Sequence, residues 1–195
     1  MINKLQEPEF IMWVMILLIF LISRFGIGLD YISVEEIIKK HIDCFRNGKN
    51  GKILKVPFTN YIILPFFMGA ATMKTKLVDD TSINIITVII SILTAMLFTI
   101  LTMVIDMKTK IKSDSEYYST EGKIVQKALL ETYYTIMFEI LVSVVLLIIC
   151  FVVNFMERYD SFKSFIIYSL TYLLIINLLI IIKKIFRVID NDMKK

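Results

Sequence analysis

The sequence predicts an all-α integral membrane protein, a bundle of four to five transmembrane helices with cytoplasmic helical extensions. Of its 195 residues 57% are hydrophobic, and the 21% that are charged gather in clusters between charge-free runs. Uncharged apolar runs of about 18 residues or more are typical of membrane spans. The charge-free runs cover residues 10–23, 56–73, 81–105, 140–156 and 164–182. We expect the whole chain, residues 1–195, to form one membrane domain.

Four of the runs predict spans directly, at residues 8–28, 82–105, 133–155 and 164–182. The run at 56–73 carries Asn60, Pro65 and Gly69, so it either spans the bilayer or forms a re-entrant segment.

The distribution of Lys and Arg favours the spanning alternative. With five spans, alternate sides of the membrane hold 17 and 5 of these residues; with four spans, each side holds 11. Short cytoplasmic loops normally carry the excess of positive charge. We therefore expect the N-terminus outside and the C-terminus in the cytoplasm.

A cytoplasmic amphipathic helix is predicted at residues 33–46. Its apolar stripe stands opposite a charged face and is followed by Lys49, Lys52 and Lys55. The helix either lies on anionic lipid headgroups or packs against the protein's own cytoplasmic face or a partner. His41, the single histidine, is expected to be solvated, and the sequence gives no metal-ligand spacing around it. The fourth hydrophobic helix is expected to run from about 123 to 156 and to protrude into the cytoplasm.

The third span carries small residues at intervals of four, which lets helix backbones approach closely in lipid. This seam either packs within one subunit or joins copies of a homo-oligomer. It consists of Thr87, Ser91, Ala95 and Thr99.

The fourth span carries the most informative pattern, a polar face on which residues recur at intervals of four: Glu131, Thr135, Glu139 and Ser143. A carboxyl group inside a span is costly and usually faces a partner or a wet cavity. Asn177 on the fifth span lies at a matching depth, because a short loop joins the two spans into an antiparallel hairpin. We expect Glu139 and Asn177 to form a hydrogen bond, serving either structure or a pore. Pro65 predicts a kink, either static or used in gating.

No enzyme is expected, since the chain has no phosphate-binding loop, no nucleophile motif and no metal cluster. No cofactor follows from the sequence. The net charge of +4 lies beside the apolar runs, which argues against direct nucleic-acid binding and for contact with membrane lipids.

The segments Tyr61–Ala71 and Ser91–Asp106 combine a Pro-bearing span with a small-residue span that ends in Asp. In this they resemble small bacterial membrane proteins encoded beside phage-defence genes, such as the membrane subunit of the Kiwa system and membrane effectors of some retrons. The resemblance implies a homo-oligomeric component of an anti-phage system that senses infection at the envelope or perturbs the membrane. It also implies a location in the bacterial inner membrane and a cytoplasmic protein partner, and it assigns no individual residue.

Two other classes of function stay open. A channel or permease subunit would use the polar residues Glu139 and Asn177. A bacteriocin-immunity or export accessory protein would suit the Lys- and Ile-rich composition.

Overall fold

The computed structural model describes residues 14, 34–46, 51–112, 120–155 and 159–193. This part of the chain contains five helices and no strand. They are α2 (Glu35–Asp43), α3 (Lys55–Thr75), α4 (Asp80–Lys112), α5 (Thr120–Asn154) and α6 (Ser161–Met193).

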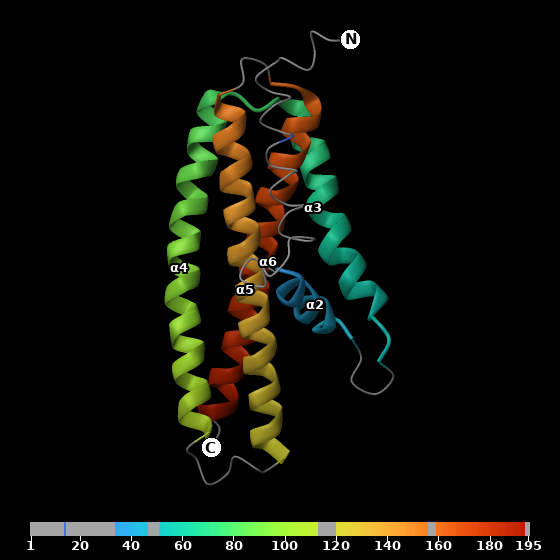
Figure 1. Cartoon of the computed structure of the whole chain (residues 1–195). Helices are drawn as coiled ribbons and strands as arrows, with labels where there is room; N and C mark the ends of the chain where they lie inside the picture. Colours follow the sequence, from blue (N-terminus) through green and yellow to red (C-terminus); the bar gives the residue numbers. More distant parts are fainter. Residues whose placement is uncertain (1–13, 15–33, 47–50, 113–119, 156–158, 194–195) are drawn as a thin grey trace.

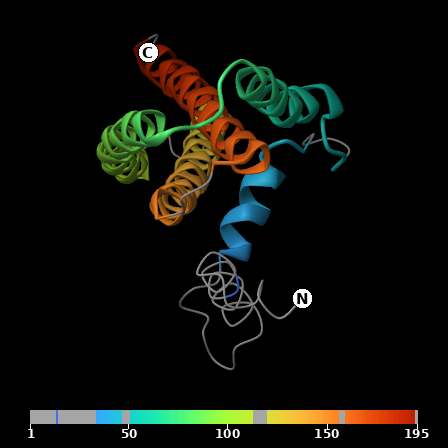
Figure 2. The same ribbon diagram turned by 90° about the horizontal axis from the view of Figure 1, so that it is seen from above.

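The helices form a bundle organised around α6. The long helices α4, α5 and α6 run side by side, and the shorter α3 leans along one side of them (Figure 1). Viewed from above, α6 lies between α3 and α5, and α4 packs on the other side of α5 (Figure 2). The short α2 contacts α5 near the level at which α3 begins.

Three of the described helices, α4, α5 and α6, are long and apolar enough to cross a membrane. They contain the predicted spans 82–105 and 164–182 and all but the last residue of the predicted span 133–155. Residues 56–73 are helical as part of α3, which is continuous from Lys55 to Thr75 with Asn60 and Pro65 inside it, and this helix is not among the three. Apart from Val14, the predicted span 8–28 lies outside the described residues. The all-helical class is confirmed, whereas a count of four or five spans stays a prediction.

The hydrophobic core is divided into two clusters along the bundle axis. The first joins α4, α5 and α6 around Ile90, Leu146 and Ile167, and the second joins the same helices around Leu97, Ile136 and Ile181. On α5 the clusters are separated by the stretch between 136 and 142, and on α6 by the stretch between 174 and 181. The gap between the clusters falls at the same level on both helices because they are antiparallel.

The turn before α4 is fixed by Asp79. Its carboxylate accepts hydrogen bonds from the backbone N–H of Ser82 at 2.8 Å and from the Ser82 hydroxyl, and it pairs with the Lys76 ammonium at 2.9 Å. The hydrogen bonds from Ser82 and Lys76 hold the pKa of Asp79 well below its usual range. An acceptor at this position satisfies N–H groups that the helix itself leaves free.

The two predicted extensions are both helical. The amphipathic segment 33–46 forms α2 over Glu35–Asp43, and the helix predicted from about 123 to 156 is α5, Thr120–Asn154. α2 packs on α5 rather than standing apart from the bundle.

Candidate functional site

The gap between the two apolar clusters is filled by polar side chains from four helices, which we call the polar layer. On α5 its members follow the predicted spacing of four: Thr135, Glu139 and Ser143 are each at most 1% exposed. This spacing places them on one face of the helix, and packing of α5 against α6 buries that face. Asn177 on α6, Tyr61 on α3 and His41 on α2 complete the layer.

Glu139 lies at the centre of the layer. The Asn177 amide lies within interaction range of both the Glu139 carboxyl group and the Tyr61 hydroxyl. Glu139 and Asn177 are therefore neighbours, as predicted. The hydrogen bond expected between them is not formed, because within the described part of the chain neither carboxyl oxygen of Glu139 and neither polar atom of the Asn177 amide has a partner with proper hydrogen-bond geometry.

His41 enters the layer from α2. Its imidazole is 2% exposed, stacks parallel on the Phe138 ring with centroids 4.1 Å apart, and has Nε2 3.2 Å from the Tyr61 hydroxyl oxygen. The expectation of a solvated histidine was wrong. Burial, with a contribution from the Lys184 ammonium, lowers the pKa of His41 to about 4, so the ring is neutral at pH 7.

The sequence contained a signal for this burial. His41 is four residues after Ile37 and four before Phe45, and so falls on the apolar stripe of its helix. A histidine on such a stripe is carried into whatever the stripe packs against, here Phe138, Phe45 and Tyr61.

Lys184 supplies a positive charge on one side of the polar layer. The sequence did not predict this role. Its Nζ donates to the Thr135 hydroxyl at 3.0 Å and lies 3.5 Å from the backbone carbonyl oxygen of Glu131. The Thr135 hydroxyl in turn donates to that same carbonyl at 2.7 Å.

The other predicted residues lie in different surroundings. The Ser143 hydroxyl donates to the Ile140 carbonyl at 2.8 Å, and Pro65 is buried within α3. Lys52 and Lys55 are exposed, and Lys49 lies outside the described residues.

The seam on α4 faces outward in this structure. Ser91, Ala95 and Thr99 are exposed and Thr87 is half-buried, whereas the α4 residues that meet the core are on another face, around Ile90 and Leu97. Ser91 and Thr99 donate to carbonyls of their own helix. Their role in joining copies stays a prediction.

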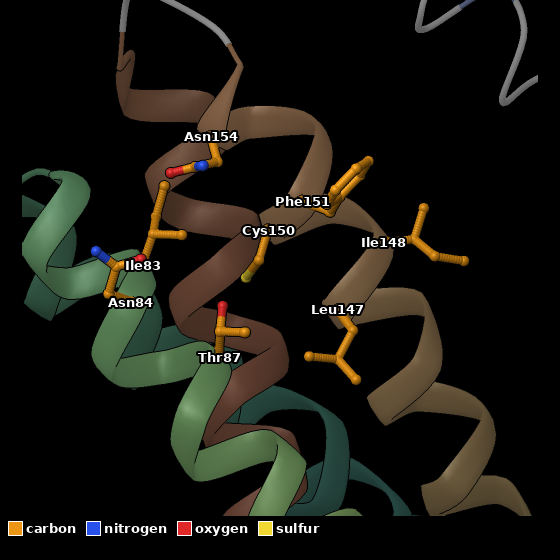
Figure 3. A pocket seen from close by; sticks show the side chains of 8 residues that line it. All are labelled: Ile83, Asn84, Thr87, Leu147, Ile148, Cys150, Phe151 and Asn154. Carbon is orange, nitrogen blue, oxygen red and sulfur yellow. The ribbon is translucent and has the colours of Figure 1, made fainter.

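A separate groove of about 420 Å³ opens between α4 and α5, away from the polar layer (Figure 3). Asn84 and Thr87 of α4 face Cys150 and Asn154 of α5 across it (Figure 3). Its remaining lining is apolar, so we assign it no chemistry.

The polar layer combines a carboxyl group, an amide, a phenol and an imidazole with two hydroxyl groups, all of them buried. In the described ranges, no cluster of three or more His, Cys, Asp or Glu residues could hold a metal ion. A buried carboxyl group without hydrogen bonds is costly in free energy, and such groups gather where a protein binds or transfers something.

No protein-family model, no curated protein and no solved structure matches the chain.

Proposed function

We propose that the chain is a membrane subunit of the channel or permease class, in which Glu139 accepts and releases protons or small cations inside the bilayer. The observation that carries this proposal is the state of the Glu139 carboxyl group. It is 1% exposed, and both of its oxygens lack a hydrogen-bond partner in the described structure.

A carboxyl group retained only for structure would be expected to have partners. Burying a polar group without hydrogen bonds costs about 1–3 kcal/mol by mutational measures. The neighbouring hydroxyls of Thr135 and Ser143 avoid this cost by donating to carbonyls of α5. The Glu139 carboxyl group has no such partner on its own helix. We infer that an occupant of the site offsets the free-energy cost of burying it.

The depth of Glu139 fits passage across a membrane. It lies six residues beyond Tyr133, which we place at the cytoplasmic boundary, or about 9 Å along a helix that rises about 1.5 Å per residue. The lipid-facing surface that such a subunit needs is present in the exposed apolar side chains of α4, among them Ile85, Val88 and Ile92.

The test is ion flux through purified protein in liposomes, measured with pH- and cation-sensitive dyes. We expect Glu139→Gln to lower the flux about tenfold or more, since the amide cannot exchange a proton or balance a cation. Glu131→Gln is the matched control, because Glu131 lies on the same helix two turns away and is half-buried. Equal flux in wild type and Glu139→Gln would contradict the proposal.

The role in phage defence, the homo-oligomeric state and the cytoplasmic partner stay predictions from the resemblance. A crosslinked pull-down of tagged protein from native cells, with and without phage, tests all three together. We expect recovery of a second copy and of one soluble partner. Recovery of a transport ATPase would favour an export accessory role instead.

A further inference from the structure

We propose that the groove between α4 and α5 binds one phospholipid of the phosphatidylethanolamine class and holds one of its acyl chains. The proposal goes beyond the ion flux assigned to Glu139, because none of the polar-layer residues lines this groove. It rests on a change of polarity along the groove that matches the change of polarity along a lipid molecule.

The groove opens on a surface of the bundle that faces lipid. Both of its walls belong to helices that are long and apolar enough to cross a membrane. Its rim carries Phe151 and Ile148, whose side chains are exposed. The volume of about 420 Å³ lies within the range of about 300–1,000 Å³ found for small-molecule sites. Because the core of a bilayer contains no water to fill such a space, hydrocarbon fills it there.

The part of the groove deeper in the membrane is suited to an acyl chain. Leu147 and Ile148 of α5 line it, and the Thr87 hydroxyl and the Cys150 thiol face one another from its two walls (Figure 3). This part alone cannot select one lipid, because lipid tails are as apolar as the walls and entering the groove gains only packing. Selection therefore depends on the polar end of the groove.

Two asparagine amides occupy that end, one from each wall (Figure 3). Asn84 lies one turn into α4, and Asn154 is the last residue of α5. Both residues are exposed, so their amides are accessible to a ligand. Each amide offers two N–H donors. The phosphate and ester oxygens of a phospholipid are acceptors, and the two amides can hold them from both sides.

The amides lie at the depth of a lipid headgroup. Asn84 is four residues after Asp80, the last charged residue before the span, or about 6 Å along the helix. Asn154 is two residues before the end of the charge-free run at 156. A bilayer is about 30 Å thick in its hydrocarbon core and about 40–45 Å with both interfacial regions, so each of these regions is about 5–7 Å deep.

The charge of the headgroup follows from Asp80. This residue is exposed, accepts a hydrogen bond from the Tyr159 hydroxyl, and lies on the same face of α4 as Asn84, one turn nearer to water. The neighbouring acid, Asp79, is paired with the Lys76 ammonium at 2.9 Å. The Asp80 carboxylate attracts the ammonium of an ethanolamine headgroup and repels the net negative charge of phosphatidylglycerol.

The test is photolabelling of the protein in vesicles of phosphatidylethanolamine and phosphatidylglycerol in equal parts. A trace of phosphatidylethanolamine carries a diazirine on one acyl chain, and mass spectrometry of the digested protein locates the label. The groove is read at Phe151 and Ile148. Ile85 and Ile89 are the matched positions, because they lie at similar depths on the exposed face of α4 and do not line the groove.

We expect the groove to be labelled about tenfold more than the matched positions, since hydrogen bonds to a charged phosphate contribute on that order. Asn84→Leu combined with Asn154→Leu removes the donors and should lower the groove label to the level of the matched positions. Thr99→Val is the control variant, because it removes a hydroxyl from the exposed face of α4 outside the groove. A phosphatidylglycerol probe should label the groove less, and Asp80→Asn should remove this difference.

Four results would overturn the proposal. Equal label at the groove and at Ile85 and Ile89 in the wild type would show bulk lipid only. A full groove label in the double variant would exclude the amides, and stronger labelling by phosphatidylglycerol would exclude the headgroup. A disulfide between two copies of Phe151→Cys would show that a second copy fills the groove. Should the double variant fail to fold, the headgroup preference of Asp80→Asn decides.

Discussion

The two sides of α6 differ in whether their polar side chains have hydrogen-bond partners. Towards α3, the Thr72 and Tyr172 hydroxyls bond at 2.8 Å, the Ser164 hydroxyl accepts from the backbone of Val78 at 3.0 Å, and the Ser169 hydroxyl alone lacks a partner in the described structure. Towards α5, the Asn177 amide and the Glu139 carboxyl group are both left unsatisfied. The first contact is built to hold the bundle together. The second keeps its hydrogen-bonding capacity for something else.

The largest effect is expected at the point where α3 and α6 are closest. A Cβ added to Gly69 would lie 2.8 Å from the backbone nitrogen of Ser169 and 2.9 Å from its Cα, so a backbone would have to move. We expect Gly69→Ala to lower the free energy of unfolding in detergent by about 3 kcal/mol, as overpacked cores do. Ala71→Leu, on the exposed face of α3, is the control and should change the melting temperature little. Unchanged stability of Gly69→Ala would show that the backbone of α6 can shift at little cost in free energy.

At the contact between α5 and α6 we expect the opposite sign for the change in stability. Replacing Glu139 with Leu removes an unpartnered carboxyl group, so we expect thermal stability to rise by about 2 kcal/mol while ion flux is lost. Thermal unfolding and liposome flux on the same preparation check both parts. A destabilised Glu139→Leu would mean that the carboxyl group contributes to the fold, and the contrast between the two sides would disappear.

The His41 contact should loosen in acid. Because burial lowers the pKa of His41 to about 4, against an ordinary 6.5, the unfolded or detached state binds more protons between these values. The stability contributed by this contact is complete above pH 6.5 and falls as the pH decreases towards 4, by about 2 kcal/mol at pH 5. Protease accessibility of α2 as a function of pH measures this. In His41→Gln the dependence should vanish, and persistence there would assign it to another group.

The smallest effect is expected for the hydrogen bond between α3 and α6. Thr72→Val and Tyr172→Phe should each cost about 1 kcal/mol, and the double variant should cost little more than either, since they share one bond. Melting temperatures of the three variants form the test. Strict additivity would show that the two hydroxyls act separately.

The sequence predicted much of the bundle and half of the polar layer, for physical reasons. Charge-free runs locate long apolar helices because lipid excludes charge, and the spacing of Thr135, Glu139 and Ser143 reveals their shared face whatever the helix packs against. The proximity of Asn177 to Glu139 could be predicted because a short loop joins α5 to α6. These are all local properties of the chain.

The remaining half depends on tertiary contacts between distant segments. His41 and Tyr61 are 20 residues apart, and Lys184 reaches Thr135 across 49 residues. The apolar stripe of α2 indicates that His41 is buried, but no local pattern specifies which helix α2 will meet. The outward orientation of Ser91 and Ala95 could not be predicted either, because a stripe of small residues permits close packing but does not specify which helix packs on it.

The continuity of α6 gives the molecule a mechanical property. From Ser161 to Met193 it is one helix, about 50 Å long at about 1.5 Å per residue, and it carries Asn177 near its middle and Lys184 two turns further on. A continuous helix of this length rotates as one body. A rotation applied at the Met193 end therefore turns Asn177 and Lys184 together. Such a rotation would thus change the surroundings of Glu139 from a distance, with no ligand entering the layer.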